Sequence, residues 1–172
     1  EEDSIRESDY KSLLIELRRM IDNAREKIVI INPFFTEDIS QKLTNPLQKA
    51  ADKGVKIQII TRYLTYGENN ENNRKFIQNF LEEESKRRMT ELFEYIDYES
   101  HITFHAKLVL VDSDSCYMGT ANLTRTSLGK NLELGIIFQD ETVKKMERLA
   151  HSILNSNLAH RVKFEDDEFK RY

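Results

Sequence analysis

Short apolar runs alternate with segments of helical periodicity in the first half of the chain, and few folds accept this alternation. Ile28–Ile31 is wholly apolar and is ended by Asn32-Pro33, which is typical of a buried strand. A helix is expected from Asn45 to Gly54, because a proline stands in its first turn and a glycine at its end. Val55–Arg62 is a second predicted strand. The order strand, helix, strand favours an α/β fold with a mixed sheet flanked by helices.

Further elements are predicted from the spacing of apolar residues. Residues recurring every three or four positions indicate helices over 8–24, over 72–96 (one long helix or two abutting ones) and over 143–154. Apolar runs indicate strands over 102–111, 116–118 and 132–138, with a turn at 112–115. The charged tail over 161–172 is expected to be an edge strand or a frayed end. The length suits a single domain covering residues 1–172.

Composition excludes several classes of protein. The chain has 26 Lys and Arg against 30 Asp and Glu, so any phosphate-binding site must be local. No apolar run approaches the ~20 residues that a membrane span needs. The single cysteine, Cys116, excludes an internal disulfide and favours a reducing compartment, the cytoplasm. The chain begins at Glu1 instead of Met, as a domain excised from a larger protein would.

Polar residues interrupt the predicted strand over 102–111. Side chains alternate between the faces of a strand, so Thr103, His105 and Lys107 would project together from one face. Such a polar row needs a cleft, a partner or water. An ordinary solvated face of the sheet is the alternative interpretation.

Two further polar stretches follow. Gly119-Thr120-Ala121-Asn122 could present backbone N–H groups and a hydroxyl to an anion. Asn131-Leu132-Glu133 brings a carboxylate, which could orient an imidazole by accepting its second ring N–H.

Taken in order, these stretches resemble the linked motifs of the phospholipase D superfamily. His105-x-Lys107-x4-Asp112 matches the family's His-x-Lys-x4-Asp, and Gly119-Thr120-x-Asn122 matches Gly-Ser-x-Asn, followed by Asn131-x-Glu133. The resemblance covers roughly residues 9–155, of which only 105–133 are specific. Thr120 stands where serine is usual, which keeps the hydroxyl. The family's Arg-Ser pair is replaced by Thr126-Ser127, with Arg125 one position early. The resemblance implies an α-β-α sandwich.

The resemblance also implies the chemistry of a phosphodiesterase. His105 would attack phosphorus to give a phosphohistidine, which divides one difficult step into two. The other matching residues would assist: Lys107, Asn122 and Thr120 by holding the phosphate oxygens, Glu133 by fixing the His105 tautomer, and Asp112 by supporting the site without touching substrate. Neither a metal nor a cofactor is expected.

In the family, a histidine from a second copy of the motif protonates the leaving oxygen. This chain contains one copy. We expect a homodimer in which both copies of His105 meet at the two-fold interface; a second motif elsewhere in the parent protein is the alternative. Three more residues are candidate substrate contacts: His101, Arg62 and Ser127.

Single-motif members of the superfamily include metal-independent nucleases, whereas two-motif members are more often lipid enzymes. The sequence therefore predicts an endonuclease acting on DNA or RNA, with Arg62 contributing charge to a substrate groove. Fold-level analogy suggests a fused or associated DNA-recognition or helicase module, as in restriction and defence systems. A lipid phosphodiesterase of the phospholipase D type and a non-catalytic dimeric binding module are the alternatives.

Overall fold

The computed structural model describes residues 13–65, 71–97, 104–124, 127–128 and 133–172, with the backbone alone for 37–41. The helices are α2 (Leu13–Asp22), α3 (Glu37–Asp52), α4 (Glu71–Phe80), α5 (Glu84–Met89) and α7 (Thr142–Leu154). The strands are β1 (Lys27–Ile31), β2 (Lys56–Thr61), β3 (Thr90–Tyr95), β4 (Leu108–Val111), β5 (Ser115–Gly119), β6 (Gly135–Phe138), β7 (Ala159–Glu165) and β8 (Glu168–Arg171).

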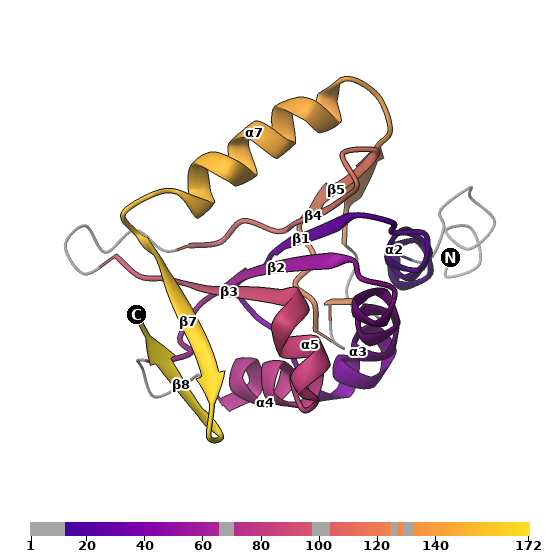
Figure 1. Ribbon diagram of the computed structural model, residues 1–172. Coiled ribbons are helices and arrows are strands. Elements are labelled where there is room, and N and C mark those ends of the chain that lie inside the picture. The colour runs from indigo at the N-terminus through magenta and orange to yellow at the C-terminus, as the bar shows by residue number, and fades with distance from the viewer. Residues whose placement is uncertain (1–12, 66–70, 98–103, 125–126, 129–132) are drawn as a thin grey trace, which may run out of the picture.

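One mixed sheet of eight strands, in the order β6-β5-β4-β1-β2-β3-β7-β8, runs through the molecule. The strands β1, β2 and β3 are parallel, and the strands on both sides of them are antiparallel to their neighbours. Helices α2, α3, α4 and α5 cover one face, and α7 covers the other (Figure 1). The predicted α/β sandwich with a mixed sheet is confirmed.

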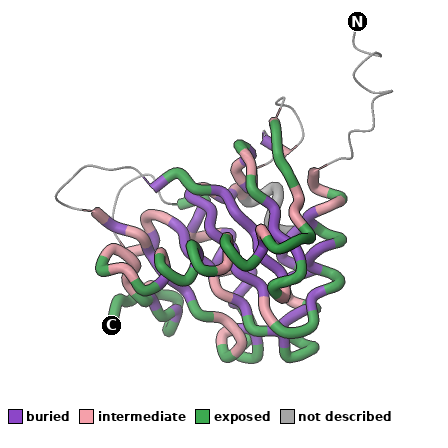
Figure 2. Tube along the Cα trace, turned by 90° about the horizontal axis from the view of Figure 1, so that it is seen from above, coloured by how far each residue is buried: buried purple, intermediate pink, exposed green. Residues whose placement is uncertain are grey.

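Both faces of the central strands are buried. Ile28 and Ile30 of β1 pack into the layer beneath α2–α4, while Val29 and Ile31 pack towards α7. Continuous burial explains why Ile28–Ile31 of β1 is an uninterrupted apolar run. Cys116 lies in the α7 layer, fully buried, and burial raises the pKa of its thiol to about 11. Buried residues follow the sheet, and exposed residues follow the outer sides of the helices (Figure 2).

The predicted helix over 72–96 is wrong in its last third, where the structure has strand β3. Leu92 and Phe93 are both buried, one on each face of the sheet. Adjacent apolar residues on a strand buried on both faces can match the spacing of an amphipathic helix, which is why the sequence predicts a helix here. Strand β3 pairs in parallel with β2, with Leu92 opposite Ile59.

Two other boundaries differ from the prediction. Helix α3 begins at Glu37, so Pro46 lies inside it and not in its first turn. The tail forms a hairpin, in which β7 pairs with β3 and β8 is the edge strand predicted there. Asp166 and Asp167 between them have positive φ angles of 53° and 61°, as a two-residue type I′ turn requires.

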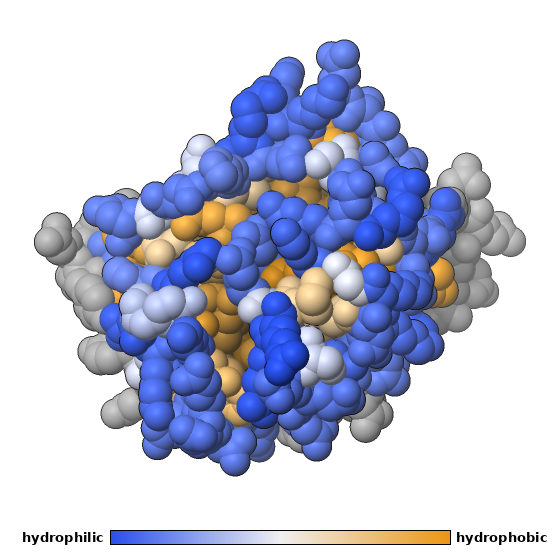
Figure 3. Space-filling view, in the orientation of Figure 1, coloured by the Kyte–Doolittle hydropathy of each residue, from blue (hydrophilic) through white to orange (hydrophobic). Residues whose placement is uncertain are grey.

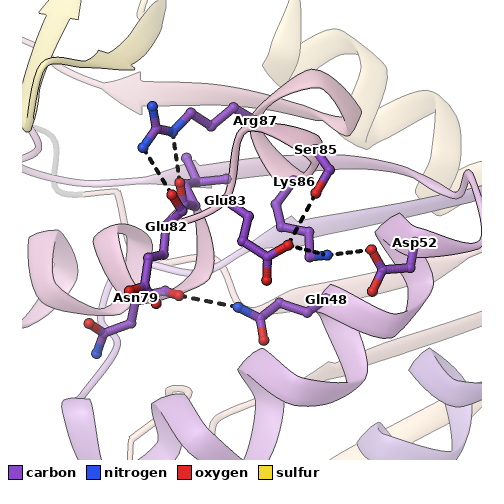
Figure 4. Close-up of polar contacts among 9 residues, drawn as sticks. Gln48, Asp52, Asn79, Glu82, Glu83, Ser85, Lys86 and Arg87 are labelled. Atoms are coloured by element: carbon purple, nitrogen blue, oxygen red, sulfur yellow. Dashed lines mark hydrogen bonds and ion pairs between the residues drawn. The ribbon is translucent and has the colours of Figure 1, made fainter.

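Helix α5 is fastened to α3 and to the end of α4 by two basic side chains. The buried Lys86 ammonium bonds Asp52 of α3 and lies 3.2 Å from Glu83 Oε2 (Figure 4). Arg87 donates to the carbonyl oxygens of Leu81 (2.8 Å) and Glu82 (3.1 Å). The Arg87 contacts satisfy carbonyl groups left open after α4.

In the described ranges of the chain, no helix combines the length and the apolar character needed to cross a bilayer.

Candidate active site

Four of the candidate catalytic residues lie on segments that meet at one edge of the sheet, where the parallel strands β1 and β2 end and β4 begins: His105, Lys107, Asn122 and Glu133. Ile31 at the end of β1 pairs with Ile60 of β2 and with Leu108, the first residue of β4. Gly119 at the end of β5 pairs with Gly135, the first residue of β6. Segments that precede Leu108, follow Gly119 or precede Gly135 are therefore brought together. Ligand sites in α/β sheets form at such carboxyl edges.

His105 and Lys107 lie just before β4, in an irregular segment, and not on a strand as predicted. His105 is exposed, whereas Lys107 is 7% exposed and folds back over it. Its Nζ donates to the His105 carbonyl oxygen (2.9 Å) and lies 2.8 Å from Nδ1 and 3.0 Å from Nε2 of the ring. An ammonium this close to the ring disfavours a second positive charge on the imidazole.

The charges around this pair favour a neutral imidazole. Partial burial lowers the pKa of His105 below its usual 6.5, and the positive charges of Lys107 and Arg62 lower it further. Burial also lowers the pKa of Lys107, and the Glu133 carboxylate partly offsets that effect. An unprotonated imidazole is the form that can act as a nucleophile.

Thr120 and Glu133 are joined directly. The Thr120 hydroxyl donates to Glu133 Oε2 at 2.5 Å and accepts the Leu134 backbone N–H at 3.1 Å. The Thr120 N–H donates to the Leu134 carbonyl oxygen at 2.9 Å. The structure thus places Glu133 next to Thr120 and within electrostatic reach of Lys107. Its role in fixing the His105 tautomer stays a prediction.

Asn122 presents an unsatisfied polar atom at this edge. Its Oδ1 is buried and has no hydrogen-bond partner within the described part of the chain. Native structures rarely leave such a group unpaired unless a ligand or water completes it. Rotation of the amide by 180° exchanges its oxygen and its NH2, so the same position can donate to a phosphate oxygen.

Gly119 is required by its neighbour Tyr117. The Tyr117 ring packs over Gly119 and the facing Gly135, and a Cβ on Gly119 would lie 2.3 Å from the Tyr117 hydroxyl and 2.6 Å from the Leu134 carbonyl oxygen. The glycine of the second motif therefore admits the aromatic ring that supports the turn into Thr120.

Asp112 lies at the opposite end of β4 from His105. Its carboxylate accepts the backbone N–H groups of Arg25 (2.7 Å), Glu26 (2.8 Å) and Lys27 (2.8 Å), which joins the start of β1 to the end of β4. Burial alone would raise the pKa of Asp112, but these hydrogen bonds and the Arg25 charge together lower it. Asp112 is predicted to support the site without touching substrate; in the structure its carboxylate joins two strands of the sheet.

The remaining predicted residues divide into three cases. Arg62 reaches the site, since its Nη1 lies 3.5 Å from the carbonyl oxygen of Phe104, the neighbour of His105. Ser127 is buried, and its backbone N–H donates to Thr124 Oγ1 at 3.2 Å. His101 lies outside the described residues, as do Asn131, Arg125 and Thr126.

Sequence reasoning missed Asn73, a buried amide that ties together the segments after β1 and β2. A signal was present, because Asn73 shares the helical spacing of Phe76 and Ile77 and must therefore face the core.

The site is separate from the groove between α5 and the β7–β8 hairpin. That cavity of about 540 Å³ has an apolar floor and a charged rim, and none of the candidate catalytic residues lines it (Figure 3). Across the described segments, no three His, Cys, Asp or Glu side chains come together to hold a metal ion.

Solved structures that share this fold include Nuc and NucT. Nuc of Salmonella typhimurium, a phospholipase D family member, superposes with a TM-score of 0.67 at 16% identity, covering 87% of this chain and 90% of that one. NucT of Helicobacter pylori gives a TM-score of 0.64 at 21% identity, covering 83% and 87%. Both superpositions cover more than four-fifths of each chain.

Sequence comparison agrees with the fold. The probable cardiolipin synthase YwiE of Bacillus subtilis is 27% identical over 145 residues, which are 81% of this chain and 26% of that protein. The chain thus spans about a quarter of the length of this relative. The family model described as cardiolipin synthase, PLD-like domain, matches residues 17–154, so the chain belongs to the PLD-like domains of the phospholipase D superfamily.

Proposed function

We propose that this domain is a metal-independent phosphodiesterase that cleaves nucleic acid through a phosphohistidine intermediate in a homodimeric site. The observation that carries the proposal is the contact between Lys107 Nζ and the imidazole of His105, which places a positive charge against the ring and so favours its neutral form. The unsatisfied amide of Asn122 and the hydroxyl of Thr120 lie on the loop that reaches the same edge of the sheet.

The proposed reaction follows from these groups. The unprotonated ring nitrogen of His105 attacks phosphorus, the P–N bond forms, and the bond to the leaving oxygen breaks as that oxygen takes a proton from an acid. Lys107 and Asn122 donate to the phosphate oxygens, where charge develops, and the Thr120 hydroxyl joins them when it turns away from Glu133 Oε2. Water then attacks the phosphohistidine and gives its proton back to the same acid, the P–N bond breaks, and His105 is released with its lone pair restored.

The acid is assigned to His105 of the partner subunit, because the chain holds a single copy of the motif. The surface next to the site favours such a partner. Three apolar side chains are exposed beside Thr120 and Glu133: Met118 of β5 (42%), Leu134 just before the edge strand β6 (66%) and Ile136 of β6 (59%). Covering this apolar patch with its own copy would bring the two sites together.

The dimer is tested with Ile136→Lys, which places a charge in the patch without touching the catalytic residues. Light scattering after gel filtration should show a dimer for the wild type and a monomer for the variant, with activity lost in the monomer. A fully active monomer would remove the shared site from the mechanism.

Nucleic acid is the favoured substrate, because the chain carries one motif and matches nearly all of the compact chains Nuc and NucT. A lipid phosphodiester is the second candidate, supported by the similarity to YwiE and by the matching family model. Purified protein in excess EDTA should cleave single-stranded DNA, duplex DNA or RNA, release no headgroup from phosphatidylglycerol vesicles, and lose activity in His105→Ala. Acid-labile phosphate trapped on His105 would identify the intermediate, and cleavage of the vesicles alone would favour the lipid candidate.

A further inference from the structure

A cation and two aromatic rings form a second surface beside His105. Arg62 directly follows β2, and its Cζ lies 4.4 Å from the centroid of the Tyr63 ring and 5.2 Å from that of the Phe34 ring, just after β1. All three side chains are partly exposed. We call Phe34, Arg62 and Tyr63 the Arg62 platform.

The platform borders the catalytic loops on two sides. Arg62 Nη1 lies 3.5 Å from the carbonyl oxygen of Phe104, and the Arg62 charge acts on the neighbouring His105. Phe35, next to Phe34, forms a parallel bridge with Leu123, the neighbour of Asn122. A phosphate held by His105 and Asn122 would therefore lie next to the Arg62 platform.

Buried polar side chains hold the backbone of the platform in place. The Asn73 amide donates to the carbonyl oxygens of Pro33 (2.9 Å) and Arg62 (2.9 Å) and accepts the Phe35 N–H at 2.8 Å. Burying such groups is costly unless they are fully paired. We call these three hydrogen bonds the Asn73 clamp. The clamp fixes the segments after β1 and after β2 relative to each other, as an exposed recognition surface requires.

A second clamp lies on the other side of Arg62. The fully buried Glu94 carboxylate accepts the backbone N–H groups of Leu64 (2.6 Å) and Thr65 (3.0 Å). Between the clamps, Tyr63 has a φ of 55°, which is unfavourable for a bulky side chain. The surrounding contacts impose this backbone conformation, and it sets the direction in which the Tyr63 ring leaves the chain.

We propose that the Arg62 platform binds the nucleotide adjoining the scissile phosphate in a single-stranded nucleic acid. A base stacks on the platform, and the guanidinium pairs with the neighbouring phosphate. This inference rests on the proposed nuclease function and adds its substrate form. A duplex offers no free base face, and a phospholipid headgroup offers a phosphate but no base.

The test compares single-stranded oligonucleotides that are identical except for one abasic residue beside the cleaved bond. Stacking on one base changes affinity roughly tenfold, so the wild type should cleave the abasic strand with a KM about tenfold higher. The variants Phe34→Leu and Tyr63→Asn should raise the KM of the ordinary strand. The KM of the abasic strand should then exceed that of the ordinary strand by less than it does in the wild type. Asparagine suits the positive φ at residue 63.

Arg62→Gln should raise the KM of both strands, since it removes the phosphate contact. Arg88→Gln is the matched control, because Arg88 is an exposed arginine of α5 paired with Glu84, and its KM values should equal those of the wild type. Thermal unfolding shows which variants are folded. The comparison of the two strands on the wild type needs no variant.

The outcomes separate this inference from the proposed function. Equal KM values for both strands on the wild type, or folded platform variants that match the wild type, would overturn the platform while the nuclease function stands. A wild type that cleaves phosphatidylglycerol vesicles and no oligonucleotide would overturn both. Faster cleavage of duplex than of single strands would also contradict a base bound on the platform.

Discussion

Lys107 Nζ lies 2.8 Å from Nδ1 of His105 and 2.9 Å from the carbonyl oxygen of the same residue, so one ammonium holds both the ring and the backbone of the candidate nucleophile. The two residues are separated by one position in the sequence. The chain reaches this geometry because the segment before β4 leaves the regular strand conformation, which lets the lysine side chain turn back over its neighbour.

The first prediction concerns the pH dependence of cleavage. Burial and the charges of Lys107 and Arg62 lower the pKa of His105 below 6.5, so the neutral imidazole persists to a lower pH than that of a free histidine. The acidic limb of kcat/KM should therefore lie below pH 6.5. Arg62→Gln removes one positive charge, raises the pKa of His105 and should move the limb to higher pH. The limb is measured from initial rates, and the pKa from the NMR titration of the His105 ring.

The matched control is again Arg88→Gln, whose charge lies on α5 and should leave the limb in place. A wild-type limb at or above pH 6.5 would contradict a nucleophile kept neutral by its surroundings.

The second prediction separates the two parts of the Thr120 side chain. Thr120→Ser keeps the hydroxyl that bonds Glu133 Oε2 and should retain kcat within about threefold, whereas Thr120→Val keeps the shape, loses the hydroxyl and should lower kcat by at least about tenfold. Steady-state rates on one oligonucleotide measure both. Equal rates for serine and valine would exclude a role for the hydroxyl in binding the phosphate.

Local patterns predicted most of the fold, and contacts distant in sequence account for what they missed. The strand at 28–31 was predictable as an apolar run ended by Asn32-Pro33, and the closing helix was predictable from its own helical spacing. Strand β3 was not, because Leu92 and Phe93 continue the helical spacing of the residues before them, and only the pairing with β2 and β7 makes this segment a strand.

The site divides in the same way. The spacing of His105, Lys107, Asn122 and Glu133 carried the family resemblance. The fold-back of Lys107 and the Asn73 clamp depend on the meeting of β1, β2 and β4 at one edge. These strands are far apart in the sequence, so local patterns could not predict the contacts between the segments that follow or precede them.

The third prediction concerns Gly119→Ala. The added methyl would overlap the Tyr117 hydroxyl at 2.3 Å and the Leu134 carbonyl oxygen at 2.6 Å, so either the ring or the start of β6 must move. We expect a loss of about 1–3 kcal/mol in the free energy of unfolding and a displaced Thr120. Urea denaturation measures the first effect and kcat the second. The double variant Gly119→Ala with Tyr117→Leu should recover part of the activity, and no loss in the single variant would refute this account of the glycine.

The last prediction tests whether Asp112 acts by joining β1 to β4. Asparagine tolerates the positive φ of 52° at residue 112. Asp112→Asn therefore keeps the backbone conformation but removes the negative charge of the carboxylate whose oxygens accept three backbone N–H groups. The free energy of unfolding at pH 7 should fall by about 2–4 kcal/mol, as measured by urea denaturation. Because folding lowers the pKa of this carboxyl, its contribution is complete above its unfolded pKa of about 3.8 and is lost as the pH falls through the lower folded value. The difference in the free energy of unfolding between wild type and variant should therefore shrink in acid.

Asp114→Asn is the control, since that exposed carboxylate pairs only with the exposed Arg25 side chain in the contacts described. This substitution should lower the free energy of unfolding by less than about 1 kcal/mol. A difference between wild type and Asp112→Asn that stays constant through this acid range would show that the carboxylate does not stabilise the fold by its charge.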